Sequence, residues 1–204
     1  MKINVFKILK KTKVEGPGVR FCIWVQGCLR QCEGCFAKAT WSHKPNKVMT
    51  VNELFNMIKE QEGIEGVTFL GGEPFEQADA LSLLAKKVHD IGLSVVTFTG
   101  AKLEDLQSVN DDGFNNLIKY SDILIDGEFV QEKFELSRPW VGSSNQRYIF
   151  LSDRYSFQDV VSAKNKVEVR INKNGMVFVN GMADFKVLKK DIGDLCLPGF
   201  KKRI

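Results

Sequence analysis

Residues 20–35, RFCIWVQGCLRQCEGC, join an apolar run to three closely spaced cysteines. The run from Arg20 to Gln26 is rich in β-branched and aromatic residues and has turn residues on both sides, which predicts a buried strand. Cys28, Cys32 and Cys35 follow directly after it. We therefore expect this strand to deliver a group of thiols at its carboxyl end.

The chain then repeats a pattern of strand followed by helix. Further buried strands are predicted at 66–70, 93–98, 122–125 and 147–151. Helices are predicted after Thr50, at 77–91, and over 102–119 with a break near 111–113. Continuous apolar strands that alternate with helices indicate a parallel sheet covered by helices. We therefore predict an α/β fold, an open and partial parallel βα barrel whose ligands bind where the strands end.

The C-terminal quarter follows a different pattern. Two short apolar runs, 166–171 and 176–179, flank the turn sequence NKNG and predict a β-hairpin. We expect residues 1–151 to form the core and residues 152–204 to form an extension packed on it or beside it. The whole chain would then be a single compact domain.

The composition is that of an ordinary globular protein, with 44% hydrophobic and 26% charged residues among 204. No run of 18 apolar residues and no signal peptide is present, so we expect no membrane partner and a cytoplasmic location. The net charge of +4 comes mainly from lysines near the two ends, at 7–13 and 201–203. We expect these ends to be solvated, and no nucleic acid to bind.

The cysteines point to a metal rather than to disulfides, because there are five and three are clustered. The spacing Cys28-x3-Cys32-x2-Cys35 is typical of zinc or iron–sulfur sites. Structural zinc would need a fourth ligand from Cys22, Cys196 or His43. We expect the two cysteines to be packing residues and the histidine to lie at the surface. Three cysteines without a fourth ligand would hold a [4Fe–4S] cluster with one open iron.

The motifs around the cysteines resemble those of radical S-adenosylmethionine (SAM) enzymes. Among these enzymes, the motifs look like those of the anaerobic ribonucleotide reductase activating proteins and related glycyl-radical-enzyme activases. Similar stretches are GPGVR at 16–20, the cysteine motif, LIDGEF at 124–129 and RPWVGSSNQR at 138–147. The resemblance covers about residues 14–151. One departure is Ala37, where the family often has asparagine.

This resemblance implies a function and its cofactors. The chain would use a [4Fe–4S] cluster to cleave SAM reductively to a 5′-deoxyadenosyl radical, and so install a glycyl radical on an anaerobic ribonucleoside-triphosphate reductase. A low-potential donor such as flavodoxin or ferredoxin would supply the electron. The cluster ligands would be Cys28, Cys32 and Cys35.

The same resemblance implies a set of SAM-binding residues. Gly71, Gly72 and Glu73 match the segment that contacts the SAM amine, although a glycine pair also suits an ordinary βα turn. Candidates from the later strand ends and the polar loop are Thr99, Asp126, Asn145 and Arg147, and Arg147 could instead pair with Asp126. Turns and a solvated loop are the alternatives for these four. The aromatic residues Trp24, Phe36 and Trp41 would be core or would shield the cluster.

Two other functions remain open from the sequence. A radical SAM enzyme could act on a small molecule or a peptide, with residues 152–204 as a cap over the substrate. A zinc module or an electron carrier would use the cysteines without SAM. Metal analysis separates the second of these from the enzyme hypotheses.

Overall fold

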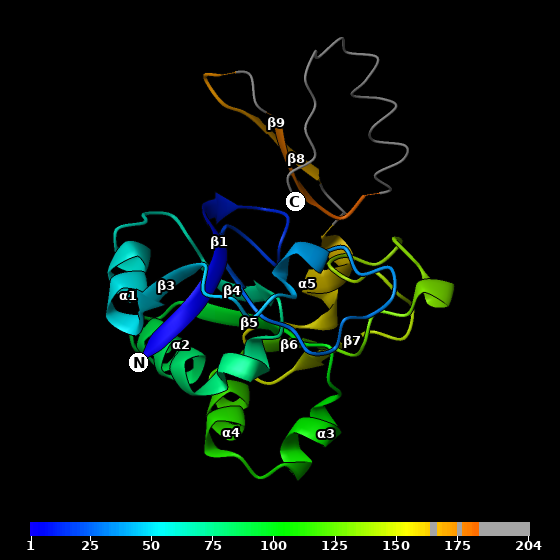
Figure 1. Cartoon of the computed structure of the whole chain (residues 1–204), viewed down its shortest axis with the longest axis horizontal. Helices are drawn as coiled ribbons and strands as arrows, with labels where there is room; N and C mark the ends of the chain where they lie inside the picture. The colour runs from blue at the N-terminus through cyan, green and yellow to red at the C-terminus, as the bar shows by residue number, and fades with distance from the viewer. Residues whose placement is uncertain (164–166, 175–176, 184–204) are drawn as a thin grey trace.

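The computed structural model describes residues 1–163, 167–174 and 177–183 (Figure 1). Within these ranges one mixed sheet has the strand order β3-β1-β2-β4-β5-β6-β7. The strands are β1 (Lys2–Thr12), β2 (Arg20–Val25), β3 (Lys47–Thr50), β4 (Gly66–Gly71), β5 (Ser94–Phe98), β6 (Ile123–Asp126) and β7 (Arg147–Phe150). Neighbours among β2, β4, β5 and β6 are parallel, whereas β1, β3 and β7 are antiparallel to their neighbours. The predicted α/β fold with a parallel centre is confirmed, and the barrel stays a prediction.

Strand β7 departs from the predicted repeat. It runs antiparallel to β6, with Arg147 opposite Asp126. A parallel neighbour needs a long crossover, usually a helix, to return the chain to the starting edge. The connection after β6 contains only a short 3₁₀ turn, Gln131–Lys133, so the chain turns back and pairs in the opposite direction.

The N-terminal segment was not predicted as a strand, and it lies inside the sheet. β1 pairs with β2 on one side and with β3 on the other. Ile3 and Val5 are fully buried, so every second residue at the start of β1 faces the core, as expected of a half-buried strand. The expectation of a solvated N-terminal end is wrong for Lys7. Its ammonium lies 5.2 Å from the centre of the Trp24 ring, and burial lowers the pKa of this lysine.

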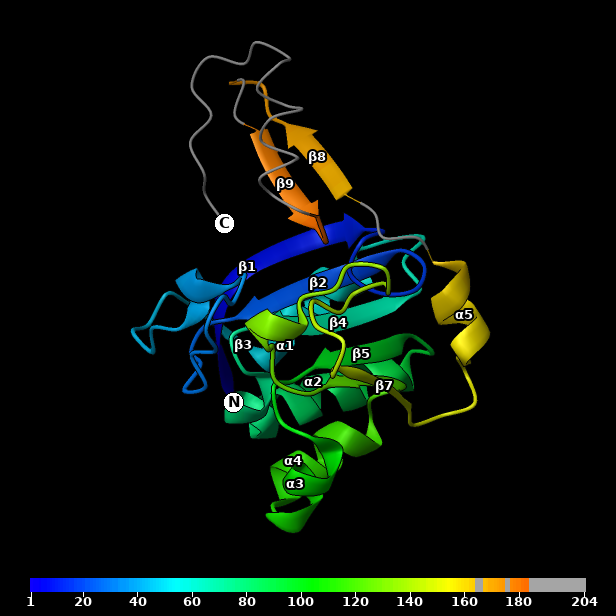
Figure 2. The ribbon, with the colours of Figure 1, turned by 90° about the vertical axis from the view of Figure 1, so that its right-hand side faces the viewer.

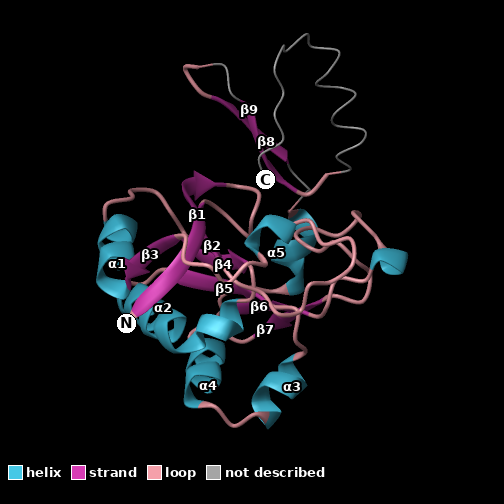
Figure 3. Cartoon of the chain, in the orientation of Figure 1, coloured by secondary structure: helices cyan, strands magenta, loops and turns pink. Residues whose placement is uncertain are grey.

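Helices cover one face of the sheet, as Figure 3 shows for α1, α2 and α4. The helices are α1 (Val51–Lys59), α2 (Ala78–Asp90), α3 (Leu103–Ser108), α4 (Asp112–Lys119) and α5 (Phe157–Ser162). The predicted start after Thr50 is confirmed by reciprocal capping bonds with Glu53, and the predicted break separates α3 from α4. In the described part of the chain, no helix has the length and apolar character that crossing a membrane requires.

The face of the sheet that points away from α1, α2 and α4 carries the alternate residues of β2, namely Arg20, Cys22 and Trp24. Arg20 is fully buried at the start of the strand. It donates to Ser94 Oγ at 2.6 Å, to Thr68 Oγ1 at 3.2 Å and to the Val67 carbonyl at 2.6 Å. Cys22 is fully buried, as predicted. The polar network fills this end of the face, so the space for a ligand lies at the other end, near Trp24.

The predicted hairpin is formed by β8 (Val167–Ile171) and β9 (Val177–Gly181). It stands over β1 in Figure 2. Thr12 Oγ1 donates to Glu168 Oε2 at 2.5 Å, and Arg170 donates to the Lys11 carbonyl. Cys196, the basic residues 201–203 and Gly175 of the predicted turn lie outside the described residues. The division of the chain at 151/152 stays a prediction.

Candidate functional site

A cavity of about 270 Å³ lies where the parallel strands end. Its walls come from the ends of β2, β4 and β5, from the loop that carries the cysteines, and from the connection between β6 and β7. Among the lining residues are Cys28, Cys32, Cys35, Gly71, Gly72, Glu73, Thr99, Gly100, Gly127 and Gln146. The carboxyl ends of parallel strands are the usual place for a ligand in such sheets, so position and chemistry agree.

The three clustered cysteines share this cavity. The loop that carries them is held at its start by bonds from the Gly27 N–H to the Thr40 carbonyl at 2.7 Å and from the Cys28 N–H to the Trp41 carbonyl at 3.2 Å. The structure puts the three thiols on one wall but does not gather them into a finished ligand set. No three Cys, His, Asp or Glu side chains in the described ranges are close enough to hold a metal ion.

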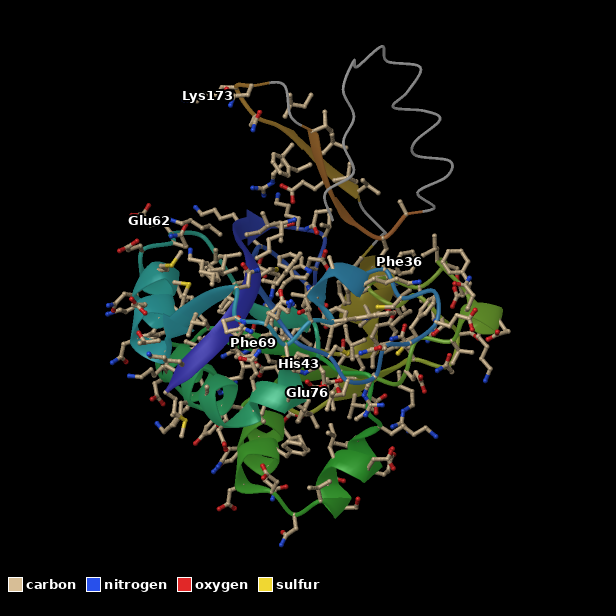
Figure 4. All side chains as sticks on the ribbon, in the orientation of Figure 1. Phe36, His43, Glu62, Phe69, Glu76 and Lys173 are labelled. Carbon is tan, nitrogen blue, oxygen red and sulfur yellow. The ribbon has the colours of Figure 1, made fainter. Side chains whose placement is uncertain are left out.

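The alternative zinc ligands lie elsewhere. Cys22 is buried in the sheet, and the His43 side chain is half exposed. His43 Nε2 lies 2.7 Å from Glu76 Oε2, and Figure 4 shows the two side chains close together. His43 therefore lies at the surface, as predicted, and it pairs with a carboxylate. Cys196 lies outside the described residues.

The glycine pair does more than turn the chain. Gly71 has φ +106°, a conformation that favours glycine, and an added Cβ there would lie 2.8 Å from Trp24 Cα. The Gly72 N–H donates to the Val25 carbonyl at 2.9 Å, and the Glu73 N–H donates to the Gly27 carbonyl at 2.8 Å. A Cβ on Gly72 would clash with that same Gly27 oxygen. The turn is thus fastened to the start of the cysteine loop.

Glu73 is a buried carboxylate at the cavity wall, with 5% of the residue exposed. It accepts hydrogen bonds from the Gly100 N–H at 2.9 Å and the Phe75 N–H at 3.1 Å. Arg30 Nε lies 3.3 Å from Glu73 Oε2. Burial raises the pKa of this carboxyl, and the two N–H donors and Arg30 oppose that rise. Glu73 can therefore pair with a cation at the cavity wall, and in this structure the Arg30 guanidinium is that cation.

Asp126, Asn145 and Arg147 do not line the cavity. Asp126 is fully buried and accepts from the Leu103 N–H at 2.8 Å and from Arg147 Nε at 2.9 Å. Arg147 also contacts Glu104, and the Asn145 amide donates to the Glu128 carbonyl at 2.8 Å. The pairing of Arg147 with Asp126 was one of the alternatives drawn from the sequence. SAM-binding roles for these three residues stay predictions, as does the role of Thr99, which lines the cavity.

Other cavity residues were missed by the sequence analysis. They are Lys7 and Glu15 beside β1, Arg30, Phe98, Phe129, Trp140, and residues 179–183 of the hairpin. Strand alternation could have found Phe98, because it lies on the same face as Trp24. The aromatic residues predicted to be core or shielding, Trp24, Phe36 and Trp41, all line the cavity.

Glu15 makes the stability of the chain depend on pH. Burial raises the pKa of this carboxyl to about 8, while Lys7 and the Gly181 N–H oppose the rise. A folded-state pKa above the unfolded one gives stability that is complete below about pH 4.5 and is lost as the pH rises to about 8. The free energy of unfolding should fall over that window by a few kcal/mol, at about 1.4 kcal/mol per pKa unit.

Glu15→Gln should remove this pH dependence, because glutamine has no proton to lose. The measurement is urea denaturation at several pH values between 4.5 and 8. We expect the variant to be less dependent on pH than the wild type and more stable than it near pH 8. An equal slope in the two proteins would show that Glu15 ionises freely in the folded chain.

Comparison with known proteins identifies the family. Residues 14–149 match the model of a family described as a 4Fe-4S single cluster domain. An anaerobic ribonucleoside-triphosphate reductase-activating protein of Enterobacteria phage T4 is 31% identical over 151 residues, which are 71% of this chain and 92% of the relative. The chain belongs to this activating-protein family. Proteins of the same name from Vibrio cholerae serotype O1 and Escherichia coli K12 are each 31% identical and are covered over 88% and 89% of their lengths.

Membership of the activating-protein family confirms the prediction made from the motifs. The description of the matched family also confirms the predicted [4Fe–4S] cluster, whereas the radical SAM class and SAM as a cofactor stay predictions. The residues fit these groups, because three thiols, a glycine turn and a buried carboxylate share one cavity. A crystal structure of QueE from Escherichia coli is similar over 50% of this chain and 54% of that one, at 22% identity and a TM-score of 0.42.

Proposed function

We propose that this chain cleaves SAM reductively and installs a glycyl radical on an anaerobic ribonucleoside-triphosphate reductase. One observation carries the proposal. The cysteine loop, the glycine turn and Glu73 meet in one cavity at the strand ends, in a chain whose relatives are named as activators of that reductase. The relatives match most of this chain, but residues after 149 lie beyond the family match at 14–149.

The three cysteines would each hold one iron and leave the fourth iron for SAM. When bound, the cluster and SAM together supply a 5′-deoxyadenosyl radical, which takes a hydrogen atom from the target glycine. Cys28, Cys32 and Cys35 would be the ligands, and this is supported by the burial of Cys22 in the sheet and the pairing of His43 with Glu76. The thiols must lose their protons to bind iron, so cluster assembly should release protons.

Glu73 and the glycine turn would orient SAM. A buried carboxylate that already accepts two N–H groups is preorganised to accept from an ammonium as well. Gly71 and Gly72 let the backbone approach the ligand without a side chain in the way. Arg30 would yield its place at Glu73 to the ammonium of SAM. Thr99, Asp126, Asn145 and Arg147 would support SAM or the loop over it.

Aromatic residues would keep water away from the radical. Phe36 packs on Phe129 with ring centres 5.4 Å apart, and Phe129, Trp24 and Trp140 line the cavity. Exclusion of water strengthens the electrostatic contacts inside a site and limits side reactions of a reactive intermediate. The electron would come from a low-potential donor such as flavodoxin or ferredoxin. A reducing compartment, the cytoplasm, would keep the thiols available.

A second function has one observation in its favour. Residues 179–183 of the hairpin line the cavity, as a cap over a small molecule or a free peptide would do. In that case the chain would turn over SAM with a metabolite or peptide and without the reductase.

Anaerobic reconstitution tests the two functions together. The loaded protein is reduced with dithionite and mixed with SAM, with and without the purified reductase. We expect 5′-deoxyadenosine in proportion to the reductase added, and a glycyl doublet in the electron paramagnetic resonance spectrum. SAM cleavage with no doublet at any reductase concentration would overturn the activase function and favour the second one.

A further inference from the structure

The cavity wall at the hairpin is formed by an uninterrupted stretch of chain. Val179, Asn180, Gly181, Met182 and Ala183 all line the cavity. Side chains of a strand alternate between its two faces, so a face turned to the cavity would contribute every second residue. A continuous run indicates that the edge of β9, with its backbone groups, is turned toward the cavity.

The hydrogen-bond pattern of the hairpin agrees with this orientation. Within the described residues β9 pairs with β8 alone, with Gly181 opposite Val167 and Val179 opposite Val169. The Gly181 N–H faces the Glu15 carboxylate and not β8. In an antiparallel pair, residues alternate between bonding across the ladder and pointing outward. The N–H and carbonyl of Val179, two residues earlier, therefore also point outward, toward the cavity.

A polar side chain beside this edge is poorly paired. Asn180 Nδ2 is buried and makes no hydrogen bond of normal geometry, although the amide is near enough to Glu15 to lower the pKa of that carboxyl. A buried donor without a well-placed acceptor is costly, and a ligand oxygen would supply the acceptor that Nδ2 needs. Asn180 also lines the cavity that holds the cysteines.

We propose that the outer edge of β9 binds an extended peptide segment of the partner protein as an added strand, with its glycine over the cavity. The segment would bond to the backbone of Val179 and give a carbonyl oxygen to Asn180 Nδ2. Main-chain bonding of this kind holds an extended peptide whatever its side chains. The small residues Gly181 and Ala183 leave room for it. This inference rests on the proposed function and names the surface that would receive the protein substrate.

Contacts of β8 fix the hairpin to the core. The contacts of Glu168 with Thr12 and of Arg170 with the Lys11 carbonyl tie β8 to β1, and β1 pairs with the strand that leads to the cysteines. The edge of β9 is thus held beside the site. Figure 4 shows Lys173, near the turn of the hairpin, far from the sheet.

Val179→Pro tests the inference, with Val179→Ala as the matched control. Proline removes the outward N–H but leaves the ladder to β8, since edge positions whose N–H faces away from the sheet tolerate proline. Alanine shortens the side chain and keeps the N–H. We expect affinity for the purified reductase, measured anaerobically by calorimetry, to fall at least about tenfold in the proline variant and less than about threefold in the alanine variant. Equal affinities for the two variants would overturn the inference.

Hydrogen exchange in the wild-type chain keeps the test valid if the proline variant folds poorly. We expect the Val179 amide to become at least about tenfold slower on addition of the reductase, because it gains a partner, while Phe178 and Asn180 change little. An unchanged exchange rate of the Val179 amide, in a complex that forms the glycyl doublet, would overturn this inference and leave the proposed function standing. Absence of both the complex and the doublet would instead count against the proposed function.

Discussion

Replacing Cys32 with alanine should abolish both the iron–sulfur cluster and the cleavage of SAM. The cube needs three protein thiolates, and no other cysteine among the described residues lines the cavity. Two thiolates leave two irons without protein ligands, so the cluster should not survive desalting. The measurements are iron and sulfide per chain after anaerobic reconstitution, and 5′-deoxyadenosine after reduction with dithionite.

Cys22→Ala is the matched control for this experiment. Cys22 is fully buried in β2 and packs as a small apolar residue, so its loss should cost about 1 kcal/mol of stability and no iron. Full iron and sulfide content in Cys32→Ala, or loss of both in Cys22→Ala, would show that the ligands have been misassigned.

Gly72→Ala should weaken both folding and SAM binding. The added Cβ would meet the Gly27 carbonyl oxygen, a backbone atom that cannot move without shifting the cysteine loop. Overpacking against backbone costs about 3 kcal/mol in the free energy of unfolding. The shift would also break the bond from the Glu73 N–H to that carbonyl and displace Glu73 from the position proposed to receive the ammonium of SAM. Urea denaturation and equilibrium binding of SAM to the reconstituted protein measure the two effects.

Gly63→Ala separates the clash from ordinary strain at a glycine. Gly63 has φ +68°, and an added Cβ there would meet nothing within 4 Å. Its replacement should cost about 1 kcal/mol from the backbone conformation alone and should leave SAM affinity unchanged. If Gly72→Ala bound SAM as tightly as Gly63→Ala, the glycine turn would be an ordinary βα turn.

The parallel centre of the fold could be predicted because its strands are buried on both faces. Arg20–Val25 and Gly66–Gly71 are nearly continuous apolar runs, and each ends at turn residues. β1 could not be recognised in the same way, since Lys7 interrupts its alternation and is half-buried, with its ammonium over the Trp24 ring. The direction of β7 depends on the missing crossover helix after β6. The place of the hairpin over β1 depends on contacts between residues about 156 apart, for which no local pattern exists.

In the site too, features set by neighbouring residues could be predicted from the sequence, and contacts between distant residues could not. Cysteine spacing is local, and it predicted which thiols share a cavity. The direction of Asp126 depends on alternation along β6, where Ile123 and Ile125 face one side and Leu124 faces the helices. Asp126 follows Leu124 in that alternation and so points away from the cavity, which the period of the strand could have indicated. The contact of Arg30 with Glu73 joins two loops and has no signal in the sequence.

Electron paramagnetic resonance of the dithionite-reduced protein, with and without SAM, tests the central claim most directly. If one iron has no protein ligand, SAM binds to it, and the g-values of the reduced cluster should change on addition of SAM. The comparison needs no reductase and no turnover. Identical spectra at saturating SAM would mean that a protein side chain fills the fourth position, and the account of this site would be wrong.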